Sequence, residues 1–206
     1  MKPKWILITA LAAMLLSAGN LQAQDRWAVK TNLLHDATGS VNLGVEYGFA
    51  PKWTASVSGS YNDWMVRDMW LNHWLVSPEV RYWFCERFQG TFFSVHAHTG
   101  ETTLGSFRDF SQYYRRFPNL ENFMHKDAFV IGAGVGFGHA FVVGRHWNIE
   151  LELGVGYMYA KGDEYQLSQT AEGKHYLPAE AMPVLEGSIF DYVGPTKMAI
   201  SVVYLF

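Results

Sequence analysis

The stretch WNIELELGVGYMY, residues 147–159, alternates apolar and polar side chains along its whole length. One alternate set is entirely apolar and runs from Trp147 to Tyr159, while the other contains Glu150, Glu152 and two glycines. A repeat of two residues indicates a β-strand, because a helix would repeat every 3.6 residues. An apolar face with Trp and Tyr at its ends is typical of a strand that faces lipid. The stretch therefore predicts a membrane-facing strand with its glutamates on the opposite side.

The same alternation recurs in seven other stretches, of which the first is the weakest. They cover residues 27–35, 41–49, 53–61, 73–84, 91–99, 128–142 and 196–206. Pro78 cannot donate to a central ladder, so we expect a bulge or local unpairing there. The sequence predicts an all-β fold, an eight-stranded antiparallel transmembrane β-barrel of the up-and-down type. The alternative is a soluble sandwich, in which Leu151 and Val202 would pack against a second sheet.

The N-terminus has the pattern of an export signal. Lys2 and Lys4 precede an apolar block, residues 5–16, and Ala23 ends the small and polar residues that follow. The block is too short to anchor the chain in a membrane. We expect a signal peptide at 1–23 and one outer-membrane β-barrel domain at 24–206.

The expected connections alternate in length, which is the second indication of a barrel. Turns after the second, fourth and sixth strands are short, whereas the segments 62–72, 100–127 and 161–194 are long. Outer-membrane barrels have short periplasmic turns and long outer loops, so both termini are expected on the periplasmic side. Each strand also has an aromatic residue at that end: Trp27, Phe49, Trp53, Phe84, Phe93, Phe141, Trp147 and Phe206.

Composition excludes some partners and sources of stability. The formal net charge of −3 becomes −5 when Lys2 and Lys4 are removed with the signal, which argues against a nucleic-acid partner. Cys85 is the only cysteine and cannot form an internal disulfide. A closed hydrogen-bonded sheet is then one source of stability.

Three motifs carry a family resemblance: VKTNLLHD at 29–36, NLGVEYG at 42–48 and HWLVSPEVRYWFCERF at 73–88. They resemble a Bacteroidetes-type outer-membrane β-barrel family that is known only as a domain of unknown function. The layout is similar to that of OmpA/OmpX-type barrels, and the C-terminal residues 204–206, YLF, resemble the signature read by outer-membrane assembly machinery. The resemblance implies fold and location, with outer-membrane lipid, that machinery and a surface or fimbrial protein as partners. It implies no catalytic residue.

The inward faces of the expected strands collect ionisable side chains. At eight strands the lumen is only wide enough for side chains, so these should interlock as a polar plug and leave no channel. A glycine row at positions 132, 134, 136 and 138 would leave room for Glu150 and Glu152. The predicted lumen polar network is Glu46, Glu79, Arg81, His96, His98, Glu150, Glu152 and Lys197.

Two further kinds of chemistry are compatible with residues of this network. His96 and His98 share a face and could ligate a metal, although lumen hydrogen bonding explains them better. Ser94 with His96 could serve a lipid A acyl hydrolase or transferase, but no sequence motif supports a triad. We therefore expect no cofactor, no metal and no catalytic residue, with a proton or ion pathway as the functional alternative.

The long loops are the better candidates for recognition, because loops on a rigid scaffold carry binding. The segment 100–127 combines aromatic residues with arginine, which is the composition of contact hot spots. The candidates are Phe107, Arg108, Tyr113, Tyr114, Arg115 and Arg116. The sequence predicts a monomeric, non-enzymatic barrel with a filled lumen, used for adhesion, fimbria-associated binding or envelope integrity. A lipid-modifying enzyme and a narrow pore are the alternatives.

Overall fold

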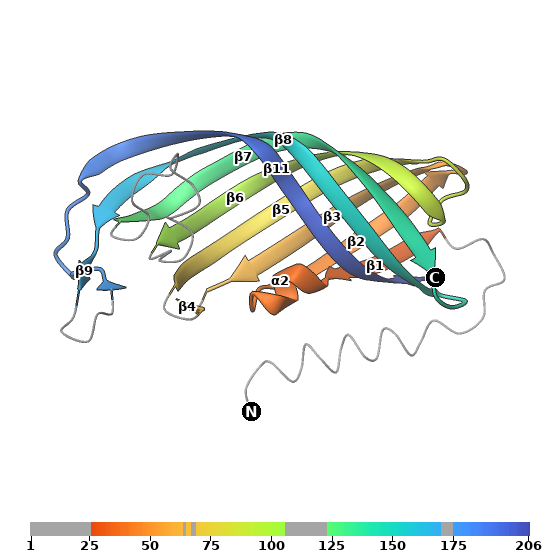
Figure 1. Cartoon of the computed structure of the whole chain (residues 1–206), viewed down its shortest axis with the longest axis horizontal. Coiled ribbons are helices and arrows are strands. Elements are labelled where there is room, and N and C mark those ends of the chain that lie inside the picture. The colour runs from red at the N-terminus through yellow and green to blue at the C-terminus, as the bar shows by residue number, and fades with distance from the viewer. Residues whose placement is uncertain (1–25, 64, 67–68, 106–122, 170–174) are drawn as a thin grey trace, which may run out of the picture.

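The computed structural model describes residues 26–63, 65–66, 69–105, 123–169 and 175–206. Within these ranges the chain is all β apart from one short helix, α2 (Leu33–Ala37). Figure 1 shows the longer strands side by side at a common tilt. In chain order the strands are β1 (Trp27–Asn32), β2 (Val41–Ala50), β3 (Trp53–Asn62), β4 (Met65–Val66), β5 (Met69–Trp83), β6 (Gly90–Gly105), β7 (Phe123–Val142), β8 (Trp147–Gln166), β9 (Ser168–Gln169), β10 (His175–Tyr176) and β11 (Leu185–Leu205).

Eight of the described strands form one closed antiparallel ring. β1, β2, β3, β5, β6, β7, β8 and β11 pair in this order, and β11 pairs with β1 to close the ring. β4 pairs only with β5, while β9 and β10 form a separate two-stranded sheet. Closure removes the free edges that an open sheet would present. The predicted all-β class and the eight antiparallel strands are confirmed.

The alternation of side chains separates the outside of the ring from its inside. Leu151 and Leu153 point outward and are 44% and 64% exposed, whereas Glu150 and Glu152 are 1% and 3% exposed. No second sheet covers the outward face of β8 in the described part of the chain, so the sandwich alternative is wrong there. The eight strand-end aromatic residues named from the sequence are all 40–54% exposed.

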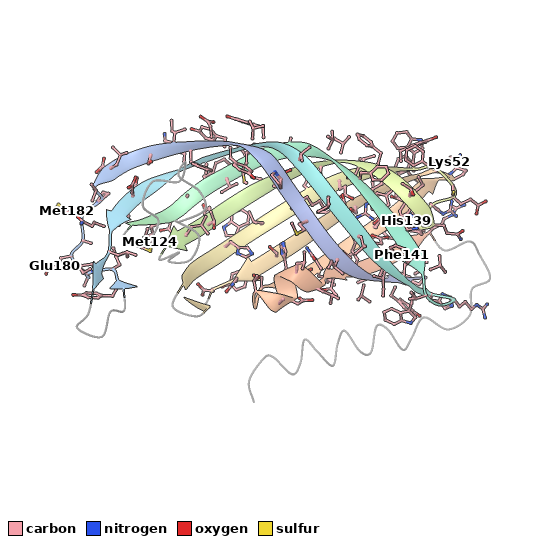
Figure 2. All side chains as sticks on the ribbon, viewed as in Figure 1. Lys52, Met124, His139, Phe141, Glu180 and Met182 are labelled. Atoms are coloured by element: carbon pink, nitrogen blue, oxygen red, sulfur yellow. The ribbon has the colours of Figure 1, made fainter. Side chains whose placement is uncertain are left out.

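The ring has two different ends. The turn end holds the short connections at 51–52, 84–89 and 143–146 together with the C-terminus. The overhang end lies opposite, where β7, β8 and β11 continue past the other strands (Figure 1). Figure 2 places Lys52, His139 and Phe141 toward the turn end, and Met124 and Met182 toward the overhang end.

The predicted long loops are shorter than expected, because strand pairing continues into them. β6 and β7 extend to Gly105 and back from Phe123, so the segment 100–127 contracts to residues 106–122, which lie outside the described residues. β8 runs to Gln166 and β11 begins at Leu185, so much of 161–194 is also strand. A ladder needs only backbone donors and acceptors, so it persists where the apolar pattern has ended.

The first predicted strand, residues 27–35, was too long. β1 ends at Asn32, which caps α2 with a side-chain oxygen that accepts a hydrogen bond from the backbone N–H of Leu34. The same side chain contacts β11, where its oxygen accepts from Ile200 N at 3.2 Å and its amide donates to Met198 O at 3.2 Å. Asn32 therefore ends the strand, starts the helix and holds both against β11.

The expected disturbance at Pro78 is present on one side of β5. Pro78 lies opposite Val57 of β3 in an uninterrupted register. On the other side, pairing with β6 stops after Val76 and resumes at Glu79 with the register unchanged. Local unpairing without a bulge accommodates the missing N–H.

A small apolar core closes the turn end from inside. It contains Ala28, Trp83, Phe88, Phe92, Ala140, Val203 and Leu205. Trp83 lies 4.7 Å from Phe92 and 6.0 Å from Phe88, measured between ring centroids. Among the described residues, no helix is both long and apolar enough to cross a membrane.

Candidate functional site: a charged cluster and a cavity inside the ring

Arg81 is the central cation of the interior. It lies on the inward face of β5 and is 2% exposed. Its guanidinium donates to Glu150 at 2.7 Å, to Glu152 at 2.9 Å and to Glu46 at 3.0 Å, and also to Glu79 of its own strand. Carboxylates from β2, β5 and β8 thus converge on one side chain. We call Arg81, the four glutamates and the two lysines described next the charged cluster.

Two lysines complete the charged cluster. Lys30 Nζ is 2.8 Å from Glu46 and 3.3 Å from Ser56 Oγ. Lys197 Nζ is 2.9 Å from Glu152 and also contacts Glu79. The four carboxylates and three cations give the cluster a formal charge of −1. Buried charges are tolerated when they are paired and hydrogen-bonded, as these are.

Neutral groups fix the cluster in place on the side of the turn end. Thr54 donates to Glu46 at 2.5 Å and accepts from Trp83 Nε1 at 3.0 Å. Ser94 donates to Glu152 at 2.7 Å. The guanidinium carbon of Arg81 also lies 4.3 Å from the centre of the Phe92 ring, which is a cation–π contact. The cluster therefore rests directly on the aromatic core.

Two histidines of β6 lie farther toward the overhang end. Their ring centroids are 4.9 Å apart. A ring nitrogen of His96 is 2.9 Å from Thr196 Oγ1, and His98 Nδ1 is 2.7 Å from Ser77 Oγ. The described residues contain no group of three or more metal-ligating side chains. Ser94 bonds to Glu152, and His96 to Thr196, so the described contacts do not pair the serine with the histidine as a nucleophile and base.

The glycines of β7 make room for inward side chains. A Cβ built on Gly134 would lie 2.7 Å from the His96 ring, and one on Gly136 would lie 3.0 Å from Glu152. Gly138 faces Phe92 in the same way. The sequence predicted room for Glu150 and Glu152, but the glycines mainly accommodate side chains of the other neighbour, β6.

A cavity of about 310 Å³ lies next to the charged cluster inside the ring. Lys30, Arg81, Lys197 and Glu152 line it, as does His98. Apolar side chains from four consecutive ring strands line another part: Leu75 of β5, Leu104 of β6, Val130 of β7 and Met158 of β8. Hydroxyl and amide side chains of the other strands contribute Asn32, Asn42, Ser58, Ser60 and Ser201. The cavity is therefore amphipathic.

α2 contributes one side chain to this cavity, His35. Its ring centroid lies 6.3 Å from that of His73. Burial lowers the pKa of His35 below its usual 6.5, the neighbouring His73 lowers it further, and Asp36 opposes both. His35 Nδ1 is buried without a hydrogen-bond partner in the described residues.

The structure brings the predicted lumen residues together inside the ring. His98 lies at the cavity, Lys197 is partly buried between the cluster and the cavity, and the others are buried in or beside the cluster. Sequence reasoning missed Lys30, because the first strand alternates weakly. Lys30 lies two residues from both Ala28 and Asn32, and this spacing of two was the available signal that it shares their inward face. The loop candidates Phe107, Arg108, Tyr113, Tyr114, Arg115 and Arg116 lie outside the described residues.

These features define a class of protein in which an eight-stranded antiparallel ring encloses a charged interior and presents apolar side chains outward. The chain belongs to the family described as Protein of unknown function (DUF3575), whose model matches residues 6–206. The predicted membership of a family of unknown function is thereby confirmed. No curated protein and no solved structure matches the chain.

Proposed function

We propose that the protein is an outer-membrane β-barrel with a plugged lumen and a structural or binding role in the cell envelope. The observation that carries the proposal is the inverted distribution of side chains, apolar outside and charged inside. Leu153, Val155 and Val57 are each more than half exposed, while Arg81 and its four glutamates are almost fully buried. In water, both the exposure of the apolar side chains and the burial of the charged ones would be unfavourable. A bilayer solvates the apolar outer face and removes the first of these costs.

The dimensions of the apolar face fit a membrane. On β8 it runs from Trp147 to Tyr157, ten residue steps. This is about 33 Å along the strand, and about 23 Å along the barrel axis for a strand tilt of roughly 45°. Outer-membrane barrels have an apolar band of about 25 Å. The outward face of this strand therefore has the length that the proposal requires.

Aromatic rings border this face at the turn end, as membrane interfaces favour. Outward rings contact one another across neighbouring strands, with centroid distances of 4.6 Å for Trp27–Tyr47, 5.0 Å for Trp53–Tyr82 and 4.9 Å for Trp147–Tyr204. Tyr61, Trp74, Phe129 and Tyr157 are exposed nearer the overhang end. Two borders support a transmembrane position, and the short connections at the turn end support placing that end in the periplasm.

The remaining parts of the proposal rest on the sequence. The signal peptide at 1–23, the C-terminal signature for assembly machinery and the OmpA/OmpX-like layout support export to the outer membrane. A monomer with a surface or fimbrial partner is the binding role that we favour, and the overhang of β7, β8 and β11 supports it by extending the scaffold beyond the ring. The bonded charged cluster favours a plug over a narrow pore. Ser94 and His96 hydrogen-bond to different partners, Glu152 and Thr196, which favours a non-enzymatic role over a lipid-modifying one.

Cysteine accessibility tests the membrane location. Cys85 lies exposed in a turn and serves as the reference site. In a second variant, Leu153→Cys is combined with Cys85→Ser, and both proteins are treated with a water-soluble maleimide in opened outer-membrane fragments, in which both faces of the membrane are accessible. We expect Cys85 to react rapidly and position 153 to be protected at least tenfold, because lipid covers it.

A matched reaction in denaturing detergent shows that both thiols are intact. Equal labelling of the two positions in the membrane fragments, or recovery of the folded protein in the soluble fraction, would overturn the proposed location. A plug further predicts no conductance above leak in planar bilayers, and stable single-channel currents would favour the pore.

A further inference from the structure

The cavity inside the ring has the size and lining of a binding site. Its volume of about 310 Å³ falls at the lower end of ligand pockets, which span roughly 300–1,000 Å³. Leu75, Leu104, Val130 and Met158 form an apolar wall, and the cations of the charged cluster form a polar floor. This combination of a broad apolar wall with a few converging polar groups is typical of sites for small molecules.

The floor retains hydrogen-bond donors that the cluster does not use. A lysine ammonium has three N–H donors, and Lys30 and Lys197 each use two in the described contacts. A guanidinium has five, and Arg81 uses four. Among the described residues, each of these three cations therefore has one donor to spare, and all three line the cavity.

Two imidazole nitrogens at the same cavity are also unpartnered. His98 Nε2 and His35 Nδ1 are buried and have no hydrogen-bond partner in the described part of the chain. Buried polar atoms are nearly always bonded, so exceptions call for a water or another bound molecule. Five unsatisfied positions around one cavity indicate that a polar group occupies it.

The charge of the cluster selects the kind of polar group. The cluster already carries a formal −1, and a like charge about 4 Å away costs about 4 kcal/mol at an effective dielectric of 20, so an anion is disfavoured. An ammonium would place its donors against the donors of Lys30, Arg81 and Lys197. A neutral hydroxyl or carbonyl accepts from these donors and adds no charge, and a hydroxyl can also donate to an imidazole nitrogen.

We propose that the cavity binds a small, neutral amphipathic molecule with a hydroxyl or carbonyl head. The head accepts hydrogen bonds from the spare donors of the charged cluster, and the apolar tail lies along Leu104, Val130 and Met158. This binding is a property of the interior and is independent of the partner that the outer loops recognise.

A matched series of three six-carbon probes tests the proposal: 1-hexanol, hexanoate and hexylammonium. The protein, folded in detergent micelles at pH 7, carries methionine labelled with ¹³C at its methyl group, and each probe is titrated while the methyl signals are recorded. Met158 lines the cavity and reports binding. Met198 also lines the cavity and should follow Met158. Met182 is 86% exposed and does not line the cavity, so it reports non-specific binding.

We expect 1-hexanol to shift the Met158 signal saturably, with a dissociation constant at least tenfold lower than that of either charged probe. Leu104→Trp should abolish the shift by filling the cavity. Leu153→Trp, the same change on the outward face of β8, should leave it intact. The fold of each variant is checked first by its resistance to unfolding in unheated dodecyl sulfate.

Three results would overturn the proposal. A saturable shift with none of the probes means that water alone fills the cavity. Tighter binding of hexanoate or hexylammonium contradicts the assigned head group. A shift that survives in Leu104→Trp, or that Met182 follows in parallel, means that the probe binds the micelle and not the cavity.

Discussion

Arg81 is the side chain on which the charged cluster depends, because it bonds to all four buried glutamates. Arg81→Met would leave these carboxylates with only Lys30 and Lys197 as counter-ions. Removing one partner from a buried ionic group costs about 3–5 kcal/mol, and we expect a loss of at least this size. Urea unfolding followed by tryptophan fluorescence measures it.

Two further variants separate lost charge from lost geometry. Arg81→Lys keeps the charge but offers three donors to four carboxylates, so an intermediate loss is expected. Arg145→Met removes an exposed arginine in the turn before β8 and should change the unfolding free energy by less than about 0.5 kcal/mol. Equal stability of Arg81→Met and Arg145→Met would show that the cluster contributes nothing.

His35 of α2 makes the stability of the protein depend on pH. Its pKa is lowered first by burial and then by His73, so the folded state binds fewer protons than the unfolded state just below pH 6.5. Stability from this group is therefore complete above pH 6.5 and is lost as the pH falls toward the folded pKa. We expect His35→Gln to lose less unfolding free energy than the native protein between pH 7 and pH 5.

The direct measurement is the imidazole titration of His35 by NMR. Its midpoint should lie below 6.5, and the difference in unfolding free energy between the two proteins should stop changing with pH above that value. A midpoint at or above 6.5, or a difference that is constant with pH, would contradict the expected burial of the ring.

At the level of single strands, the glycines of β7 leave room for the inward side chains and the backbone of the neighbouring strands β6 and β8. A Cβ on Gly138 would lie 2.6 Å from the carbonyl oxygen of Leu151, a backbone atom that cannot move aside, and would also meet Phe92. We expect Gly138→Ala to destabilise the protein by about 1–3 kcal/mol through overpacking. Gly59→Ala is the matched control, since its nearest heavy atom would lie at 4.0 Å. Similar unfolding midpoints for both variants would refute this account.

The sequence predicts strands well where one face is apolar and the other polar, as in β2 and β8. It fails at their ends, because the pairing of β8 with β11 continues where the apolar alternation is broken by residues such as Asp163 and Asp191. Both side chains accept hydrogen bonds across this pair. α2 was missed for a related reason. VKTNLLHD continues the strand pattern weakly, and the position of the helix start is supported by contacts of Asn32 with Met198 and Ile200 of β11, which are 166 and 168 positions away in sequence.

Apart from Lys30, the charged interior was predictable in membership but not in arrangement. Inward parity identifies Glu46, Glu150 and Glu152, since each has apolar neighbours on both sides. That Arg81 bonds all of them depends on the stagger between β2, β5 and β8, which a single sequence does not encode locally. The cavity was not foreseen, because it results from small inward side chains and short polar side chains meeting at one level of the ring.

For the molecule as a whole, closure between the first and last strands is the property on which the enclosed charges depend. β1 pairs with β11 in a defined register, with Val29 opposite Tyr204. Directly opposed residues of antiparallel strands have Cα atoms about 4.5–5.5 Å apart, within the range that a disulfide bridges. In a Cys85→Ser background, we expect the pair Val29→Cys and Tyr204→Cys to form a disulfide under mild oxidation of the folded protein.

An off-register pair makes this prediction specific to the closed ring. Val29→Cys with Ile200→Cys keeps both positions on the same two strands but moves one thiol four residues along β11, beyond the reach of a disulfide. A ring with the described register links the first pair and leaves the second reduced, which non-reducing gel mobility and thiol titration both measure. An open or mobile seam would link both pairs slowly and to similar extents. In that case water would reach Lys30 and Glu46 through the gap between β1 and β11, and the burial that holds the charged cluster together would be lost.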